Sequence, residues 1–257
     1  MNATNFDQAE IARQKELFEA IHEKYAEATT DQYAEAYKEE FIYQPILSEL
    51  EDARSLMELA SGVGTAAGWM AAHHPDLEIS GCDISESACE EFRERHDRPC
   101  YVWDLTKPVE VEETYDAVLV MGGIHHLVAD LPMAFENIAK MLNPGGKLIM
   151  SEPNADFILE PARQLWYKLD TENFDAENEH ALSHPKLAES YAKGLTPTSV
   201  RYIGGPAYFL LLQNWVLRVP NGTKKYLAPV LMGLERGWHK LPGRLPFSTF
   251  VAVWEKQ

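Results

Sequence analysis

The chain has 257 residues and a mass of 29.1 kDa, enough to bury the core of one large α/β domain with attachments or of two small domains. With 46% apolar and 25% charged residues it is not a disordered chain, and no segment approaches the roughly 18 uninterrupted apolar residues of a membrane span. Its formal net charge of −17 argues against a nucleic-acid binder, because Lys and Arg supply most of the affinity for a phosphate backbone.

The N-terminal segment, residues 1–52, is acidic and carries helical patterns. We predict one helix over residues 6–28 and a second that begins near Asp31, with aromatic side chains four positions apart on one face: Tyr33, Tyr37 and Phe41. An acidic start of this kind is unlike a secretory signal, which is basic and then apolar. We therefore expect a cytoplasmic protein whose N-terminal segment is a helical attachment.

From Ser55 onward, short apolar runs alternate with amphipathic stretches, which is typical of strand–helix–strand units and a mostly parallel sheet. We expect residues 53–153 to form this core, with strands at 55–60, 78–84, 100–105, 115–121 and 147–153. Helices are predicted between them at 65–74, 85–95 and 130–142. Ser85 and Asp130 are the expected N-caps of the last two.

After Pro153 the regular alternation is lost. We predict helical structure at 154–192 and 206–240, a strand at 198–205, and a closing strand at 247–256. Apolar residues occupy both faces of the closing strand, as expected for a strand buried on both sides. Residues 154–245 would then form a helical cap that includes a sixth strand, and residues 246–257 would complete a seven-stranded sheet.

The first strand leads into a glycine-rich turn. Glu58 lies at its end, and Gly62 and Gly64 occupy the turn before the next helix, so the backbone there can approach a ligand closely. Nineteen residues after Gly64, Asp83 ends the second strand, where a carboxylate can accept hydrogen bonds from both hydroxyls of a ribose. A ribose-bearing cofactor is the simplest inference, and the glycine pattern alone also permits a dinucleotide.

Further motifs distinguish between these cofactors: Asp104-Leu105 after the third strand, Tyr115-Asp116 opening the fourth, Pro144-Gly145-Gly146 before the fifth, and the closing strand itself. With them the sequence resembles the class I S-adenosylmethionine-dependent methyltransferases over roughly residues 55–155 and the final strand. The resemblance implies a three-layer, Rossmann-like α/β fold whose seven-stranded sheet is mostly parallel with an antiparallel last strand, and the N-terminal helices would act as a lid.

The resemblance also assigns roles in holding S-adenosylmethionine. It implies that the methionine portion is held by Glu58 and the backbone of Ala60, Gly62 and Gly64, and that Met121 and Gly122 line the same end. Asp83 would bind the ribose, Ile84 would cover one face of the adenine, and the adenine edge would meet Asp104 and Leu105. Ala60 departs from the family pattern, which usually has glycine there. Tyr33 or Tyr37 of the lid would touch the cofactor carboxylate.

Two histidines are candidates for catalysis. His125 and His126 follow the fourth strand, where the methyl group should emerge, and a histidine there can act as a general base because it titrates near neutral pH. The alternative is packing or cofactor contact. His180 and His184 are four apart and would share one helix face, but no third ligand follows from the spacing, so we predict no metal site.

Residues 194–257 are the only basic part of the chain, with eight Lys and Arg against two Glu. They would either attract an anionic acceptor or dock against the acidic remainder. Our prediction is a methyltransferase acting on oxygen or nitrogen of a small molecule, sugar or glycan, with no nucleic-acid partner. The alternatives are a non-catalytic cofactor-binding partner subunit and an NAD(P)-dependent oxidoreductase.

Overall fold

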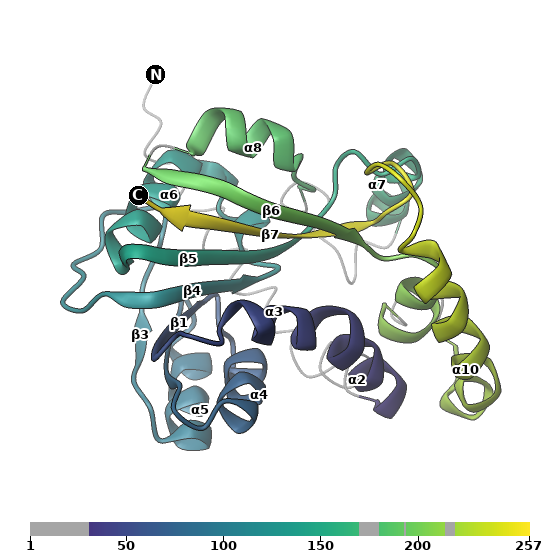
Figure 1. Ribbon diagram of the computed structural model, residues 1–257, viewed down its shortest axis with the longest axis horizontal. Helices are drawn as coiled ribbons and strands as arrows, with labels where there is room; N and C mark the ends of the chain where they lie inside the picture. Colours follow the sequence, from purple (N-terminus) through teal and green to yellow (C-terminus); the bar gives the residue numbers. More distant parts are fainter. Residues whose placement is uncertain (1–30, 170–179, 193, 214–218) are drawn as a thin grey trace.

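A computed structural model describes residues 31–169, 180–192, 194–213 and 219–257 of the chain. They contain one seven-stranded sheet in the order β3-β2-β1-β4-β5-β7-β6 (Figure 1). The strands are β1 (Ser55–Leu59), β2 (Glu78–Asp83), β3 (Cys100–Val102), β4 (Tyr115–Met121), β5 (Leu142–Pro153), β6 (Leu195–Ile203) and β7 (Thr249–Lys256).

The pairing confirms the predicted mixed sheet. The first five strands are parallel to one another, whereas β7 is antiparallel to both β5 and β6. The expected third strand is too long by three residues, because Asp104 accepts hydrogen bonds from the backbone N and Oγ1 of Thr106 and so turns the chain after β3. The fifth strand begins earlier than expected, since Leu142 pairs with Tyr115 and residues 143–146 form an irregularity in the ladder before pairing resumes at Lys147.

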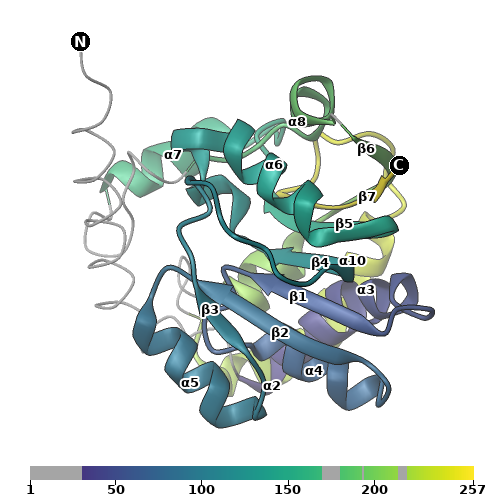
Figure 2. The same ribbon diagram turned by 90° about the vertical axis from the view of Figure 1, so that its left-hand side faces the viewer.

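Helices cover both faces of the sheet, which gives three layers (Figures 1 and 2). Alternate strand residues divide between two buried clusters, as the two-faced pattern of the closing strand predicts. In β7, Val251 and Val253 belong to one cluster, whereas Phe250, Ala252 and Trp254 belong to the other. Helices α4 (Thr65–His73) and α5 (Glu86–His96) pack against the first face, and α6 (Leu131–Met141) and α8 (His184–Tyr191) against the second.

The two predicted N-caps are present, and a third lies at Asp31, where the sequence predicts the start of a helix. Asp31 accepts hydrogen bonds from the backbone N of Tyr33 and Ala34 at the start of α2 (Gln32–Lys38). Ser85 Oγ accepts from Ala88 N at α5, and Asp130 accepts from Met133 N at α6, where Pro132 stands in the first turn. These side chains satisfy helix N–H groups that have no partner within the helix.

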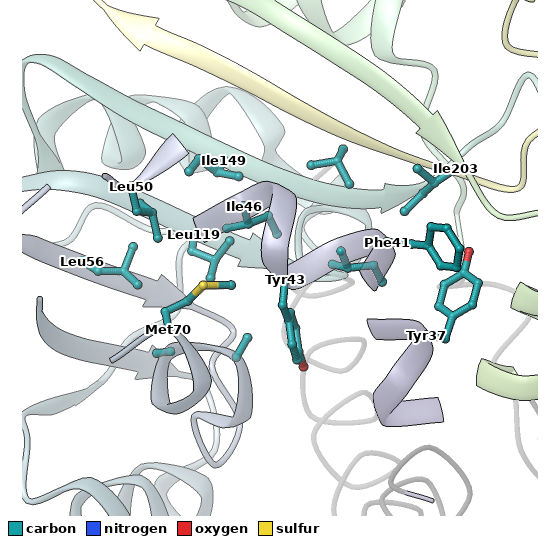
Figure 3. Packing of buried hydrophobic residues seen from close by; sticks show 14 of the residues in the cluster. Tyr37, Phe41, Tyr43, Ile46, Leu50, Leu56, Met70, Leu119, Ile149 and Ile203 are labelled. Carbon is teal, nitrogen blue, oxygen red and sulfur yellow. The ribbon is translucent and has the colours of Figure 1, made fainter. Parts of the chain in front are cut away.

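The described part of the N-terminal segment packs directly on the sheet. Helix α2 continues through the π-helical turn η1 (Glu39–Tyr43) into α3 (Gln44–Glu49). Its buried aromatic and aliphatic side chains meet strand residues Leu56, Leu119, Ile149 and Ile203 in one cluster (Figure 3). The helix predicted over residues 6–28 lies outside the described residues. Residues 31–50 are therefore part of the core, and any lid function must be assigned on other grounds.

The C-terminal region holds α7 (Glu160–Leu169), the π-helical turn η4 (Tyr208–Leu212) and α10 (Asn221–Trp238). Helix α10 buries two charged side chains, Lys224 and Glu235, and both are 0% exposed. Lys224 pairs with Asp31 and donates to the carbonyl of Leu211 at 2.9 Å. No helix in the described ranges is long and apolar enough to cross a membrane.

Candidate functional site

The strand order reverses direction between β1 and β4, because β2 and β3 continue to one side of β1 and β4 and β5 to the other. In open parallel sheets, ligands bind beyond the carboxyl ends of the strands at such a point. The carboxyl ends of β1, β2 and β4, together with the segments that follow them, hold most of the predicted cofactor residues. We call the group formed by Glu58, the Ala60–Gly64 turn, Asp83, Asp104 and residues 122–125 the strand-end site.

The turn after β1 has an unusual backbone. Gly62 and Gly64 have φ of +51° and +74°, and Ala60 also has a positive φ of +49°. A Cβ at Gly64 would lie 2.4 Å from the Phe92 ring, so glycine is required there. The left-handed backbone of Ala60 explains why glycine is the usual residue at this position, because a Cβ makes that conformation costly.

Glu58 is a buried carboxyl at the base of this turn. It is 3% exposed, and its Oε2 accepts a hydrogen bond of 3.1 Å from Ala67 N at the start of α4. Desolvation by burial raises the pKa of Glu58 to about 8, with a smaller contribution in the same direction from the nearby Asp83 carboxylate. A cationic group brought to this position would favour the charged form, so Glu58 is suited to receive one.

Asp83 connects the first two strand ends. Its Oδ2 accepts from Gly62 N at 2.9 Å, and its Oδ1 accepts from Ser85 N at 2.9 Å. Each carboxylate oxygen keeps a further lone pair for a ligand hydroxyl. Ile84, which follows directly, is half-buried. The structure thus brings together Glu58, Gly62 and Asp83, as the sequence predicted.

The segment that follows β3 also lies at the strand-end site. Trp103 N donates to Asp83 O at 3.0 Å, so the segment after β3 is bonded to the end of β2. Asp104 is the next residue of that segment. Asp104 accepts from Thr106 and pairs with Lys107 Nζ at 2.6 Å. Burial would raise the pKa of Asp104, but these bonds from Lys107 and Thr106 outweigh it and lower the pKa below its usual value. Leu105 is buried in the second cluster.

The segment after β4 packs against the turn after β1. Met121 and Gly122 are half-buried, and Gly122 has a φ of +70°. A Cβ at Gly123 would lie 2.8 Å from the Cβ of Ala60, so only glycine permits this close approach. Sequence reasoning did not single out Gly123, although its place next to Gly122 at a strand end was a usable signal.

Glu152 is the main candidate residue of the site that sequence reasoning missed. It is 0% exposed, near the end of β5, and its Oε1 accepts from Gly123 N at 3.0 Å and from Ile124 N at 2.8 Å. Its Oε2 lies 2.8 Å from His125 Nδ1 and accepts a longer bond of 3.4 Å from His125 N. An acid within an otherwise apolar strand pattern was the available signal.

The two candidate histidines differ in their surroundings. His125 is 8% exposed and is held by Glu152, whereas His126 is half-buried. Their ring centroids lie 3.9 Å apart at an interplanar angle of 41°. Of the two, His125 is the one whose ring is bonded to the buried Glu152 carboxylate.

Tyr33 and Tyr37, the two tyrosines predicted to touch the cofactor carboxylate, also lie in different surroundings. Tyr37 is 0% exposed, and its hydroxyl donates to Glu235 Oε1 at 2.9 Å. Burial, together with the Glu235 charge, raises the pKa of Tyr37 well above its usual value. Tyr37 therefore stands in the packing between α2 and α10, whereas Tyr33 is half-buried. The structure supports a packing role for Tyr37 and leaves Tyr33 as the candidate from this segment.

The remaining histidines do not form a metal centre in the described parts of the chain, where no group of three potential ligands occurs. His184 is 7% exposed, and its Nε2 accepts from Trp254 Nε1 at 3.1 Å. Burial lowers the pKa of His184, which favours the neutral ring that this bond requires. His180 is exposed, and residues 170–179, which carry most of the neighbouring acids, lie outside the described residues.

Several basic residues of the C-terminal quarter are paired within the chain. Lys224 pairs with Asp31, Arg236 with Glu40 at 2.6 Å, and Arg244 with Asp156 at 3.1 Å. Two of the three acidic partners belong to the N-terminal segment. For these residues the structure supports docking against the acidic remainder of the chain rather than attraction of an anionic acceptor.

Comparison with known families agrees with this geometry. A family model described as a methyltransferase domain matches residues 57–148, which run from β1 into β5 and contain Glu58, the glycine turn and Asp83. The match covers the core of the chain and less than half of its length, and it supports a methyltransferase domain there. Glu152 and the C-terminal strands lie outside the matched range.

Individual curated relatives match the chain at low sequence identity. The chain is 26% identical over 121 residues to a ubiquinone/menaquinone biosynthesis C-methyltransferase UbiE of Desulfotalea psychrophila, covering 45% of this chain and 49% of that protein. It is 29% identical over 157 residues to a demethylmenaquinone methyltransferase of Symbiobacterium thermophilum, covering 56% of this chain and 60% of that protein. It therefore spans about half the length of these curated relatives.

Among solved structures, the plantazolicin methyltransferase BamL, in complex with a triazolic desmethylPZN analog and SAH, is similar with a TM-score of 0.61. The match covers 96% of both chains at 12% sequence identity. At this identity the likeness establishes a shared fold.

Proposed function

We propose that the chain binds S-adenosylmethionine at the strand-end site and transfers its methyl group to a small-molecule acceptor. The observation that carries this proposal is the direct connection of the turn after β1 to Asp83 at the end of β2, through Gly62 N, next to the point where the strand order reverses. Buried Glu58 stands beside the same turn. A nucleoside with a charged amino-acid tail matches this set of groups.

The residue roles follow from the chemistry of each group. Glu58 and the backbone of Ala60, Gly62 and Gly64 would hold the methionine portion, since a buried carboxyl with a raised pKa gains from a nearby ammonium. Asp83 would accept from the ribose hydroxyls with its remaining lone pairs.

The adenine would lie between Ile84 and the segment after β3, where Asp104 and the backbone of Leu105 meet its edge. Met121 and Gly122 would line the methionine end, and Tyr33 is proposed to reach the cofactor carboxylate. Asp104 already accepts from Thr106, so its bond to the adenine amine would use the remaining lone pairs.

When bound, this cofactor supplies a methyl group already activated by the sulfonium charge. The chain then has to hold the acceptor in line with the bond to sulfur, at about 3–3.5 Å, and to exclude water. A general base helps when the acceptor carries a proton of high pKa and contributes typically about 10²–10⁴ in rate. Between the two candidates we assign this role to His125, because Glu152 fixes its ring.

The acceptor is proposed to be a small molecule, a sugar or a glycan. The pairing of Lys224, Arg236 and Arg244 within the chain removes one reason to expect an anionic group on it. Oxygen and nitrogen remain the proposed methylated atoms, and carbon joins them because one relative is named a C-methyltransferase.

Calorimetric titration with S-adenosylhomocysteine and, separately, with NADH tests the cofactor. We expect binding of S-adenosylhomocysteine and none of NADH. Binding of NADH alone would overturn the proposal in favour of an oxidoreductase. Transfer of a labelled methyl group to any acceptor then separates an enzyme from a non-catalytic binding subunit, in which S-adenosylhomocysteine would bind without turnover.

A further inference from the structure

The turn after β1 is held from two sides. On one side it is bonded to the end of β2, where Gly62 N donates to Asp83 Oδ2 at 2.9 Å. On the other side it is bonded to the last residue of α5, where His96 Nε2 lies 3.0 Å from the carbonyl oxygen of Val63. A carbonyl oxygen can only accept, so His96 Nε2 carries a proton and donates in this contact, whatever the charge of the ring.

The bond from His96 takes the place of a helical bond. Ala67 N is four residues beyond Val63 and would donate to Val63 O if α4 began earlier. It donates instead to Glu58 Oε2, at 3.1 Å. Within the described residues, His96 is the donor to Val63 O, and this leaves Ala67 N for the buried carboxyl of the strand-end site.

Two glycines leave the space that the His96 ring occupies. A Cβ at Gly64 would lie 2.7 Å from His96 Nε2, and a Cβ at Gly68 would lie 2.5 Å from His96 Cε1. The three atoms nearest to the Gly68 position all belong to this ring. Phe92, one helical turn earlier in α5, is 0% exposed and packs edge-on against the ring with centroids 4.8 Å apart. The ring is therefore fitted closely against the backbone at the start of α4.

The backbone of this turn needs such support. Ala60, Gly62 and Gly64 all have positive φ. At a non-glycine residue that conformation persists only where the surrounding structure holds it. A loop that is already held in its binding shape gives a higher affinity, because less ordering is lost when the ligand binds. A side chain that fixes the end of the turn should therefore act on the affinity for the molecule that the turn receives.

We propose that His96 is a positioning residue for the cofactor. Its ring holds the carbonyl of Val63 and keeps the turn after β1 in the shape that receives the methionine portion. The ring acts through the backbone of Val63 rather than by touching the cofactor. This inference rests on the proposed function, and it adds α5 to the elements that shape the strand-end site.

His96→Ala removes the donor. Val63 O then either stays unpaired or draws Ala67 N away from Glu58, and calorimetry should show an affinity for S-adenosylhomocysteine about 5–100-fold lower. His96→Gln should restore most of the affinity, because its amide N–H can donate to the same carbonyl.

His73→Ala is the matched control for the lost ring. The Nδ1 atom of His73 lies 2.8 Å from Trp69 O, so this ring is also bonded to a backbone carbonyl, but it is exposed on α4 away from the turn. This variant should bind S-adenosylhomocysteine as tightly as the unmodified protein.

Gly68→Ala displaces the ring and keeps the histidine. Alanine is favoured over glycine inside a helix, so a weaker α4 would not explain a loss of binding. We expect a several-fold lower affinity for S-adenosylhomocysteine, measured on protein that urea unfolding shows to be folded. In a His96→Ala background, Gly68→Ala should cause no further loss, because the ring that it displaces is absent. Gly233→Ala in α10 is the control, since its Cβ would meet nothing within 4 Å.

An unchanged affinity in His96→Ala or in Gly68→Ala would overturn the positioning role, as would a further loss when the two are combined. If His96→Ala does not fold, Gly68→Ala and His96→Gln still decide the question. Failure of S-adenosylhomocysteine to bind to the unmodified protein would instead reject the proposed function itself.

Discussion

Two regions of the molecule are built around a fully buried glutamate, and the two glutamates have nearly the same kinds of partners. Glu152 accepts from the backbone of residues 123–125 and contacts the ring of His125. Glu235 accepts from the backbone of Gly205 and Ala207 and from Tyr37, and it contacts the ring of His239. We call this second region, with Lys224 and Asp31, the α2–α10 junction.

The difference lies in where the partners come from. The donors to Glu152 are three consecutive residues at the carboxyl end of β4, so this glutamate shapes a single turn. The donors to Glu235 come from α2 and from the segment after β6, and Tyr37 is 198 positions away in sequence. In this chain, Glu152 thus shapes one turn at the carboxyl ends of the strands, whereas Glu235 joins elements that are distant in sequence.

The largest expected effect is a loss of stability in a variant of the α2–α10 junction. Glu235→Ala leaves two backbone N–H groups and the Tyr37 hydroxyl without an acceptor, and the free energy of unfolding should fall by about 3–5 kcal/mol. Burial would raise the pKa of Glu235, but the hydrogen bonds from His239, Gly205, Ala207 and Tyr37 outweigh it and lower the pKa, which favours the charged form.

Urea unfolding measures this loss, and S-adenosylhomocysteine affinity of the folded variant should be unchanged. A fall below about 1 kcal/mol, or a weakened affinity at full folding, would remove the distinction between the junction and the strand-end site.

Unlike Glu235→Ala, Asp83→Asn should lower the affinity for S-adenosylhomocysteine more than it lowers the free energy of unfolding. Loss of charge-assisted bonds costs about 1.5–3 kcal/mol, so S-adenosylhomocysteine should bind about 10–150-fold more weakly. Asp116→Asn is the control, because Asp116 accepts from the backbone of Arg54 and Ser55 at the amino ends of the strands. Equal losses of affinity in both variants, measured by calorimetry, would contradict the proposed site.

The strand-end site should also show a pH dependence that the junction does not cause. The pKa of Glu58 is raised from 4.5 to about 8, so the folded state holds its proton more tightly than the unfolded state. The stabilisation is present below about pH 4.5 and is lost as pH rises toward 8, with a slope of at most about 1.4 kcal/mol per pH unit. Urea unfolding at several pH values should therefore show a flatter profile for Glu58→Gln; an unchanged profile would contradict the burial argument.

Tyr37→Phe is the mildest test of the comparison. It removes one neutral donor to Glu235 and keeps the ring that packs 4.9 Å from Phe41, so the free energy of unfolding should fall by about 1 kcal/mol. Thermal unfolding measures the loss. A marked fall in S-adenosylhomocysteine affinity would instead return Tyr37 to the cofactor contacts that the sequence suggested.

Local sequence patterns predicted the sheet well, because each strand carries its own apolar period and each capped helix its own first-turn side chain. The seven strands, the caps at Ser85 and Asp130 and the helix start near Asp31 were accessible in this way. The turn after β1 and the position of Asp83 were also predictable, since both follow directly from strand ends.

Contacts between distant segments were beyond such patterns. Glu152 is 27 positions from His125, and only the parallel pairing of β4 with β5 places it beneath that turn. In α10 the charged residues Lys224 and Glu235 face inward, which a rule of polar surfaces would place outside. Tyr37 could not be separated from Tyr33 without knowing that Glu235 lies next to it.

The central claim is that the strand-end site receives the cationic tail of an adenosyl cofactor at Glu58. The direct measurement is calorimetric titration of S-adenosylhomocysteine at pH 7 in two buffers of different ionisation enthalpy, for the unmodified protein and for Glu58→Gln. Because Glu58 has a pKa of about 8 in the free protein, binding should release about one proton, and the variant should release none. No binding, or equal proton release by both proteins, would contradict the claim.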